Sequence, residues 1–143
     1  MLTQYIRQNI IDICSRYEIA DLYVFGSRSR EIVQRCANIP VQSKNDSDID
    51  IGVLPVYMKT WTPEKRIDLT IELEDIFMTR RIDLVMLSEA DPFLALDIIR
   101  GELLYTNDAD CQARYELFIL RRAGDLTPFK KARSKMILEE GCR

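Results

Sequence analysis

The chain has 143 residues, of which 47% are hydrophobic and 30% charged, and its formal net charge is −3. This length and composition predict a single globular domain with a core of its own and exclude a disordered protein. The slightly negative charge argues against general binding to the phosphate backbone of nucleic acids. No apolar run approaches the roughly 20 residues that cross a bilayer, so we expect neither a membrane span nor a membrane partner.

Two further features of the composition limit the chemistry. The four cysteines are scattered without a C-x-x-C pair, and the chain contains no histidine. This pattern argues against a zinc site and predicts reduced thiols in a cytoplasmic protein. Without histidine, acid–base chemistry near neutral pH must come from carboxylates, lysine, tyrosine or cysteine.

The N-terminal part of the chain alternates between helix and strand patterns. Apolar residues recur at helical spacing over residues 2–17, and a β-branched and aromatic run follows and stops at Gly26. We therefore predict a helix over 2–17, a strand over 21–27, a helix over 27–37 with Ser27 as its N-cap, and a loop over 38–46.

The rest of the chain continues the alternation. Thr62 and Pro63 are typical of a helix start, and Gly101 of a helix end. The sequence predicts strands over 48–53, 81–87 and 102–106, helices over 63–78 and 91–101, a loop that includes Pro55, and two C-terminal helical stretches broken around 124–128. This order predicts an α/β or α+β fold with a mixed sheet of about four strands flanked by helices.

The second predicted strand contains acidic residues on one face. Side chains alternate along a strand, so Asp48 and Asp50 share one face while the isoleucines between them are buried on the other. Asp83 repeats this pattern in the third strand. If these strands are neighbours, three carboxylates meet, and hard oxygen ligands of this kind suit Mg²⁺ or Mn²⁺ that also binds phosphate.

A structural role is the alternative for each of these acids. An aspartate on the solvent face of a strand is ordinary, and an isolated D-x-D motif is a weak signal for metal. Asp46 is interpreted as a loop or cap residue and not as a ligand.

The turn after the first predicted strand, "GSRSR" at 26–30, has the features of a phosphate site. Gly26 permits a tight turn with close backbone approach, and Ser27 offers a hydroxyl beside the free N–H groups of a helix start. Arg28 and Arg30 would neutralise outer phosphate oxygens. Any strand-to-helix turn may have this form, so the turn is informative only together with the acidic strands.

These motifs resemble the nucleotidyltransferase fold of the DNA polymerase beta superfamily, and most closely its minimal, MNT-type branch. The matching segments are "FGSRSR", "SDIDIGV", "IDLVML" and "IIRGELLYTND", so the likeness extends from about residue 21 to 107. The chain departs from the common G-S-x-A-R-G form at Ser29 and Glu31. The interval between Ser27 and Asp48 is also longer than usual in the family.

The resemblance implies roles for individual residues. Gly26 and Ser27 would bind the triphosphate of ATP, with Arg28 and Arg30 beside it. Asp48 and Asp50 would ligate two Mg²⁺ ions, and Asp83 would complete the metal site and help to deprotonate the attacking hydroxyl. The reaction expected is attack on the α-phosphorus of a nucleoside triphosphate with release of pyrophosphate.

The resemblance also implies a partner. Minimal members of the family are typically paired with a HEPN-type toxin, and the chain would transfer AMP from ATP to a tyrosine of that toxin as its antitoxin. A small hydroxyl acceptor such as an aminoglycoside and a non-catalytic toxin-masking module are the alternatives. We expect one minimal nucleotidyltransferase domain over 1–143 whose C-terminal helical segment, 108–143, either contacts a partner or completes the core; homo-oligomerisation stays open.

Overall fold

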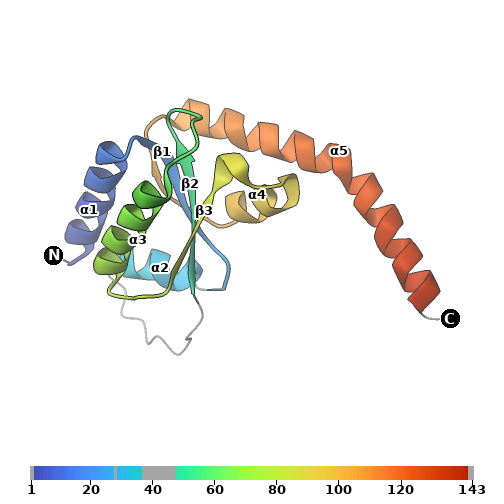
Figure 1. Ribbon diagram of the computed structural model, residues 1–143, viewed down its shortest axis with the longest axis horizontal. Coiled ribbons are helices and arrows are strands. Elements are labelled where there is room, and N and C mark those ends of the chain that lie inside the picture. The colour runs from blue at the N-terminus through green and yellow to red at the C-terminus, as the bar shows by residue number, and fades with distance from the viewer. Residues whose placement is uncertain (1, 28, 37–47, 142–143) are drawn as a thin grey trace.

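The computed structural model describes residues 2–27, 29–36 and 48–141. Figure 1 shows a sheet with helices on both faces and a long C-terminal helix that extends away from it. The elements in chain order are α1 (Leu2–Arg16), β1 (Ile19–Phe25), α2 (Ser29–Cys36), β2 (Ile49–Pro55), α3 (Pro63–Phe77), β3 (Ile82–Met86), the 3₁₀ helix η1 (Leu87–Glu89), α4 (Pro92–Ile99), β4 (Glu102–Thr106) and α5 (Ala109–Gly141).

The four strands form one mixed sheet in the order β3-β2-β1-β4. β1 pairs antiparallel with both β2 and β4, whereas β2 and β3 are parallel. The parallel pair follows from the connection, because α3 returns the chain to the starting end of β2 before β3 begins. The predicted fold class, a mixed four-stranded sheet flanked by helices, is confirmed.

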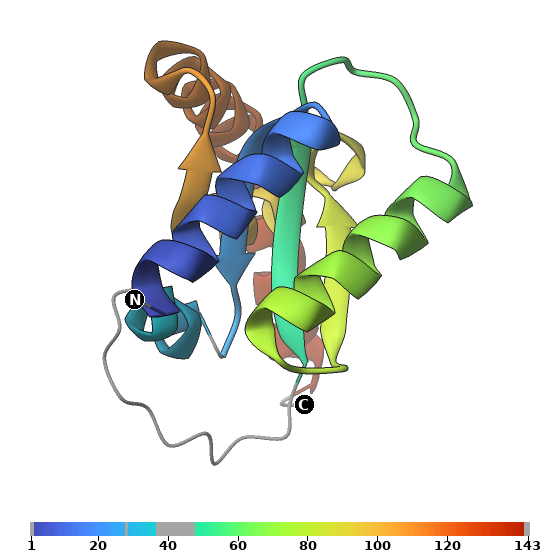
Figure 2. The same ribbon diagram turned by 90° about the vertical axis from the view of Figure 1, so that its left-hand side faces the viewer.

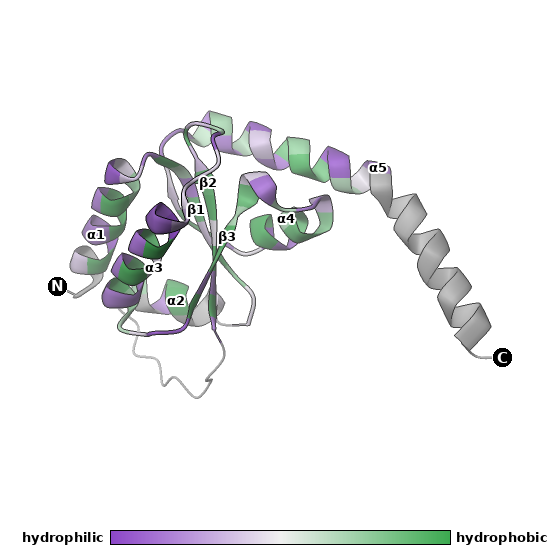
Figure 3. Ribbon diagram, in the orientation of Figure 1, coloured by the Kyte–Doolittle hydropathy of each residue, from purple (hydrophilic) through white to green (hydrophobic). Residues whose placement is uncertain are grey.

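Each face of the sheet has its own apolar core. Side chains of β1 alternate between them: Leu22 and Val24 belong to the core under α1, α2 and α3, whereas Tyr23 and Phe25 belong to the core under α4 and α5. In Figure 2, α1 and α3 lie in front of the sheet and cover its first face. Figure 3 shows hydrophobic and hydrophilic bands alternating along both helices, as expected for helices with one buried face.

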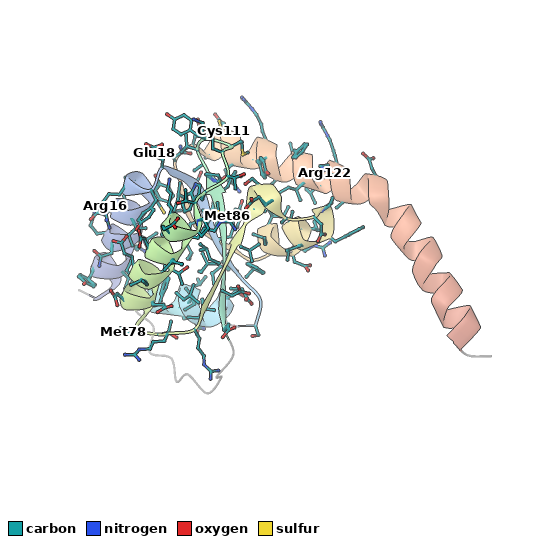
Figure 4. The ribbon with its side chains drawn as sticks, viewed as in Figure 1. Arg16, Glu18, Met78, Met86, Cys111 and Arg122 are labelled. Atoms are coloured by element: carbon teal, nitrogen blue, oxygen red, sulfur yellow. The ribbon has the colours of Figure 1, made fainter. Side chains whose placement is uncertain are left out.

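Local signals place the ends of the helices beside the sheet. The Thr62 hydroxyl accepts a hydrogen bond from the Lys65 N–H, which confirms Thr62 as the cap of α3. α3 ends at Phe77 and is capped by Met78, which has a left-handed backbone with φ of 50° and donates its N–H to the Glu74 carbonyl. Figure 4 places Met78 at the lower end of the sheet, opposite Glu18 and Cys111. The chain therefore enters β3 from the lower end.

Besides shifts of one or two residues at the ends of elements, three expectations about the elements were wrong. α2 begins at Ser29, so Ser27 lies in the turn before it and does not cap the helix. Pro55 is the last residue of β2 and not part of a loop, because the strand pairs with Ile19 up to that position. The C-terminal region is one helix, α5, and not two.

The helix α5 continues through the segment that the sequence analysis expected to break it. A proline in a helix interior removes one backbone hydrogen bond but does not always end the helix, and Figure 1 shows the axis of α5 changing direction midway along its length. Gly124 lies on the helix surface with nothing within 4 Å of the position of a Cβ. No helix within the described ranges is long and apolar enough to span a lipid bilayer.

The first half of α5 is attached to the sheet by apolar and polar contacts. Ile119 and Ala123 are buried. The Tyr23 hydroxyl, which is buried under the helix, donates to the Glu116 carboxylate at 2.9 Å and accepts from the Gln112 amide at 2.9 Å. This half of the predicted segment 108–143 thus completes the core through Ile119, whereas Phe118 is about half exposed.

We predict opposite effects for two glycine substitutions. A methyl group at Gly101 would lie 2.3 Å from the Val24 carbonyl oxygen and 2.8 Å from Cβ of Phe25. Gly101→Ala should therefore lower the free energy of unfolding by about 1–3 kcal/mol. Gly124→Ala meets no atom and should raise this free energy by about 0.5–1 kcal/mol through helix propensity. Urea denaturation of both variants checks this, and equal shifts would contradict the packing at Gly101.

Candidate active site

The acidic side chains meet where β2 and β3 run side by side. Asp50 and Asp83 are register partners in the parallel pair and so point to the same face of the sheet. Asp48 directly precedes β2, and the Ile49 N–H donates to the Arg81 carbonyl at 2.7 Å, which joins the starts of the two strands. Asp48 and Asp83 are exposed to solvent, whereas Asp50 is partly buried.

The turn that follows β1 lies directly against Asp50. Phe25 is the antiparallel partner of Asp50, and Gly26 comes next with φ of 80°. A methyl group at Gly26 would lie 2.3 Å from Oδ2 of Asp50, so the backbone and the carboxylate are in direct contact only because no side chain stands between them. Ser27 is exposed in the turn, and the Ser29 N–H donates to the Gly26 carbonyl at 3.3 Å.

The electrostatic environment of Asp50 reflects this convergence. Partial burial raises the pKa of the Asp50 carboxyl above its ordinary value, and the nearby charges of Asp83 and Asp48 raise it further. The structure therefore brings Asp48, Asp50 and Asp83 near one another, with Asp50 and Asp83 on the face opposite the isoleucines of β2. It also places Asp50 beside Gly26, the residue before Ser27.

The donor set fits a hard divalent cation. Within the described ranges, no three histidine, cysteine or acidic side chains stand close enough together to form a complete metal site. The unfavourable interaction of Asp50 with Asp83 and Asp48 is nevertheless the kind that a bound cation relieves, and carboxylate oxygens are ligands that Mg²⁺ accepts. The residues present thus fit a magnesium ion, and their roles as ligands stay a prediction.

The remaining residues proposed for the site are placed only in part. Arg28 and Asp46 lie outside the described residues. The backbone of Arg30 belongs to α2, but its side chain is outside the description. The expected contribution of the two arginines to phosphate binding therefore stays a prediction.

Two features near the site were missed by the sequence analysis. Arg80 and Arg81 precede β3, so they lie at the same end of the sheet as the acids. Their position directly before an acidic strand was the sequence signal that could have placed them near the site. Gly101 packs against the end of β1, where a Cβ on this residue would lie 2.8 Å from Cβ of Phe25. A glycine between a helix and a strand predicted the end of α4 but not this contact.

A separate cavity of about 410 Å³ is lined by residues near the other end of β2. Its walls include Pro55, Tyr57, Trp61 and Lys65, and the Lys65 ammonium lies over the Trp61 ring at 4.3 Å from its centroid. None of the acids of the candidate site lines this cavity. The cavity and the candidate site are therefore distinct.

Comparison with known proteins identifies the family. A family model described as polymerase beta, nucleotidyltransferase matches residues 8–110. Because the match covers well over half of the sequence, the chain belongs to this nucleotidyltransferase family. No curated protein matches the sequence significantly.

Several solved structures share the fold. A chain from a crystal structure of a toxin–antitoxin with AMP-PNP is 20% identical, with a TM-score of 0.70 over 92% of this chain and 98% of that chain. Another, from a tri-AMPylated Shewanella oneidensis HEPN toxin in complex with MNT antitoxin, is 22% identical, with a TM-score of 0.61 over 99% of both chains. The resemblance to the minimal, MNT-type branch is confirmed at the level of the fold.

We predict that Asp50→Asn stabilises the protein when divalent cations are absent. Because the folded state raises the pKa of Asp50, stability is lost as the pH rises through that pKa and the carboxyl ionises. The amide removes this loss, so the free energy of unfolding at pH 7 should rise by less than about 1 kcal/mol, since the partly exposed carboxylate is screened by solvent. The gain should shrink as the pH falls toward the ordinary aspartate value of 3.8.

Urea denaturation in EDTA between pH 3.5 and pH 7 measures this effect. Asp68→Asn, at an exposed position of α3, serves as the matched control. A gain for Asp50→Asn that grows toward acidic pH would contradict the assignment.

Proposed function

We propose that this nucleotidyltransferase uses Mg²⁺ to transfer AMP from ATP to a tyrosine hydroxyl of a HEPN-type toxin and thereby acts as its antitoxin. The observation that supports this most is the register of Asp50 with Asp83 beside the Gly26 turn. Chains of the same fold occur in a toxin–antitoxin with AMP-PNP and in a complex with a tri-AMPylated HEPN toxin. These likenesses supply the choice of nucleotide and partner.

In this proposal the turn after β1 binds the triphosphate. Gly26 lets the backbone come close to the phosphates, and the exposed Ser27 offers its hydroxyl in the turn before α2. Arg28 and Arg30 belong to the same segment and would balance the charge of the outer phosphate oxygens. The phosphates then lie beside Asp50, which contacts Gly26.

The three acids form the reacting centre. Asp48 and Asp50, with Asp83, would hold two Mg²⁺ ions, which when bound supply positive charge to the attacking and leaving oxygens. Asp83 accepts the proton of the acceptor hydroxyl. The hydroxyl oxygen forms a bond to the α-phosphorus, the bond to the bridging oxygen of the β-phosphate breaks, and pyrophosphate leaves with the electron pair of that bond.

The first test removes the proposed metal ligands. The protein is incubated with labelled ATP, Mg²⁺ and the product of its neighbouring gene, and the acceptor is analysed by mass spectrometry for the addition of one AMP. Asp48→Asn combined with Asp50→Asn should lower the rate by at least about 100-fold, because charge stabilisation in the transition state is lost. Asp68→Asn, which changes an exposed acid on α3, should leave the rate unchanged.

The outcomes separate the remaining functions. Labelling that survives the double substitution would refute the metal assignment. If the chain binds the product of the neighbouring gene but does not label it in the presence of ATP and Mg²⁺, this would indicate a non-catalytic module that masks the toxin. AMP found on a small hydroxyl compound such as an aminoglycoside, and not on the protein, would indicate a different acceptor class.

The second test concerns the turn. Gly26→Ala would place a methyl group 2.3 Å from Oδ2 of Asp50 at a residue with positive φ, so either the carboxylate or the turn must move. A displacement of about 1 Å at a reacting centre can cost about 100-fold in rate, and we expect a loss of this order in AMP transfer. Gly124→Ala is the matched control on the surface of α5. Full activity of Gly26→Ala would contradict the proposed phosphate position.

A further inference from the structure

The outer edge of β3 pairs with no strand in the part of the chain that the structure describes. β3 is the last strand of the sheet, and within the described ranges only β2 pairs with it. Figure 2 shows it as an outside strand of the sheet. Its side chains Ile82, Leu84 and Val85 are only half-buried, whereas most residues of β1 and β2 are fully buried. The edge therefore offers both peptide groups and apolar surface.

The direction of each peptide group of β3 follows from its pairing with β2. The Ile49 N–H donates to the Arg81 carbonyl, and Ile49 is the register partner of Ile82. In a parallel pair, every second residue of a strand points its N–H and C=O groups toward the neighbouring strand. In β3 these residues begin at Arg81 and include Asp83. The N–H and C=O groups of Ile82 and Leu84 point away from β2, toward the outer edge of the sheet. Neither residue makes a further backbone hydrogen bond within the described ranges.

The same register puts the candidate site in line with this edge. Phe25, Asp50 and Asp83 are successive register partners across β1, β2 and β3, so the row ends at Asp83 on the outer strand. A residue opposite Asp83 on an added strand would lie about 4.8 Å away with its side chain on the same face. The opposite edge of the sheet, β4, is separated from Asp83 by two strands.

We propose that the acceptor protein adds an extended segment to the outer edge of β3 and so presents its hydroxyl residue opposite Asp83. The outward groups of Ile82 and Leu84 bind the backbone of this segment, and the half-buried aliphatic side chains of β3 are covered by it. This inference rests on the proposed function, because it explains how the acceptor hydroxyl reaches the acids. It assigns recognition to the backbone, with the side chain opposite Asp83 as the group that reacts.

A second copy of the chain is a poorer occupant of this edge. Pairing of two β3 strands would add another Asp83 and Val85 to the face of the site, since these are the β3 residues on that face. It would increase the negative charge and supply no hydroxyl. The oligomeric state in the presence and absence of the acceptor distinguishes the two occupants.

The principal test compares Ile82→Pro with Ile82→Ala. Proline is tolerated at the first residue of an edge strand, and here it removes an outward N–H without breaking the ladder to β2. Both variants lose the branched isoleucine side chain, but only proline loses the donor and places its ring at the edge. We expect the KM for the acceptor protein to be at least about fivefold higher for Ile82→Pro than for Ile82→Ala. The affinity for ATP with Mg²⁺, measured by calorimetry, should be the same for both.

A second measurement uses the unaltered protein, so that it does not depend on the folding of a variant. Amide hydrogen exchange is followed by NMR with a non-hydrolysable ATP analogue and Mg²⁺, with and without the acceptor protein. The N–H groups of Ile82 and Leu84 should exchange at least about tenfold more slowly in the complex, because hydrogen-bonded amides are protected. Those of Asp83 and Val85, which already face β2, are the internal control and should change less.

The results distinguish this inference from the proposed function. AMP transfer by the wild type together with equal acceptor KM values for the two variants and no protection at Ile82 and Leu84 would overturn the edge-strand mode alone. Protection of these amides by self-association without the acceptor would overturn it in favour of a second copy. Absence of both AMP transfer and ATP binding in the wild type would overturn the proposed function as well.

Discussion

The in-register pairing of β2 with β3 is the constraint on which the site depends. It sets Asp50 beside Asp83 on one face of the sheet, and the hydrogen bond from Ile49 to Arg81 fixes the start of both strands. A shift of one residue in this pairing would place Asp50 and Asp83 on opposite faces of the sheet. The alternation of apolar residues in β2 therefore determines where the charge lies. Because Ile49 and Ile51 are buried on one face of the sheet, the side chain of Asp50 lies on the other.

The fold holds these like charges together at a cost in stability. The raised pKa of Asp50 shows that its ionised form is less favourable in the folded chain than in water. Burial of apolar side chains on both sides of the sheet offsets this cost. Close packing at Gly52, where a methyl group would lie 2.5 Å from Ile98, holds α4 against the strand that bears Asp50. Rigid strands, and not loops, thus position two of the three acids.

The sequence was sufficient for the features that depend on local alternation or capping. The period-two pattern around Asp50 and Asp83 predicted the shared face, and the Thr62 cap and the bounds of β4 were correct. The order of the strands could not be read from the sequence, because pairing depends on contacts between distant segments. α5 was divided at its Gly and Pro signals because local propensity favours a break there. Local sequence signals do not report tertiary contacts. For α5 these contacts include the burial of Ile119 and the hydrogen bond between Tyr23 and Glu116.

The exposure of the acids to solvent connects the chemistry of the site to the binding of the acceptor protein. Asp48 and Asp83 are exposed, so water reaches the acids in the isolated chain. A transferase must favour its acceptor over water, and exclusion of water strengthens the electrostatic interactions that stabilise the transition state. The row of register partners Phe25, Asp50 and Asp83 ends on β3, the last strand of the sheet, so an acceptor strand bound at its outer edge would shield Asp83 from one side. In this arrangement the acceptor is both the substrate and a wall of the site.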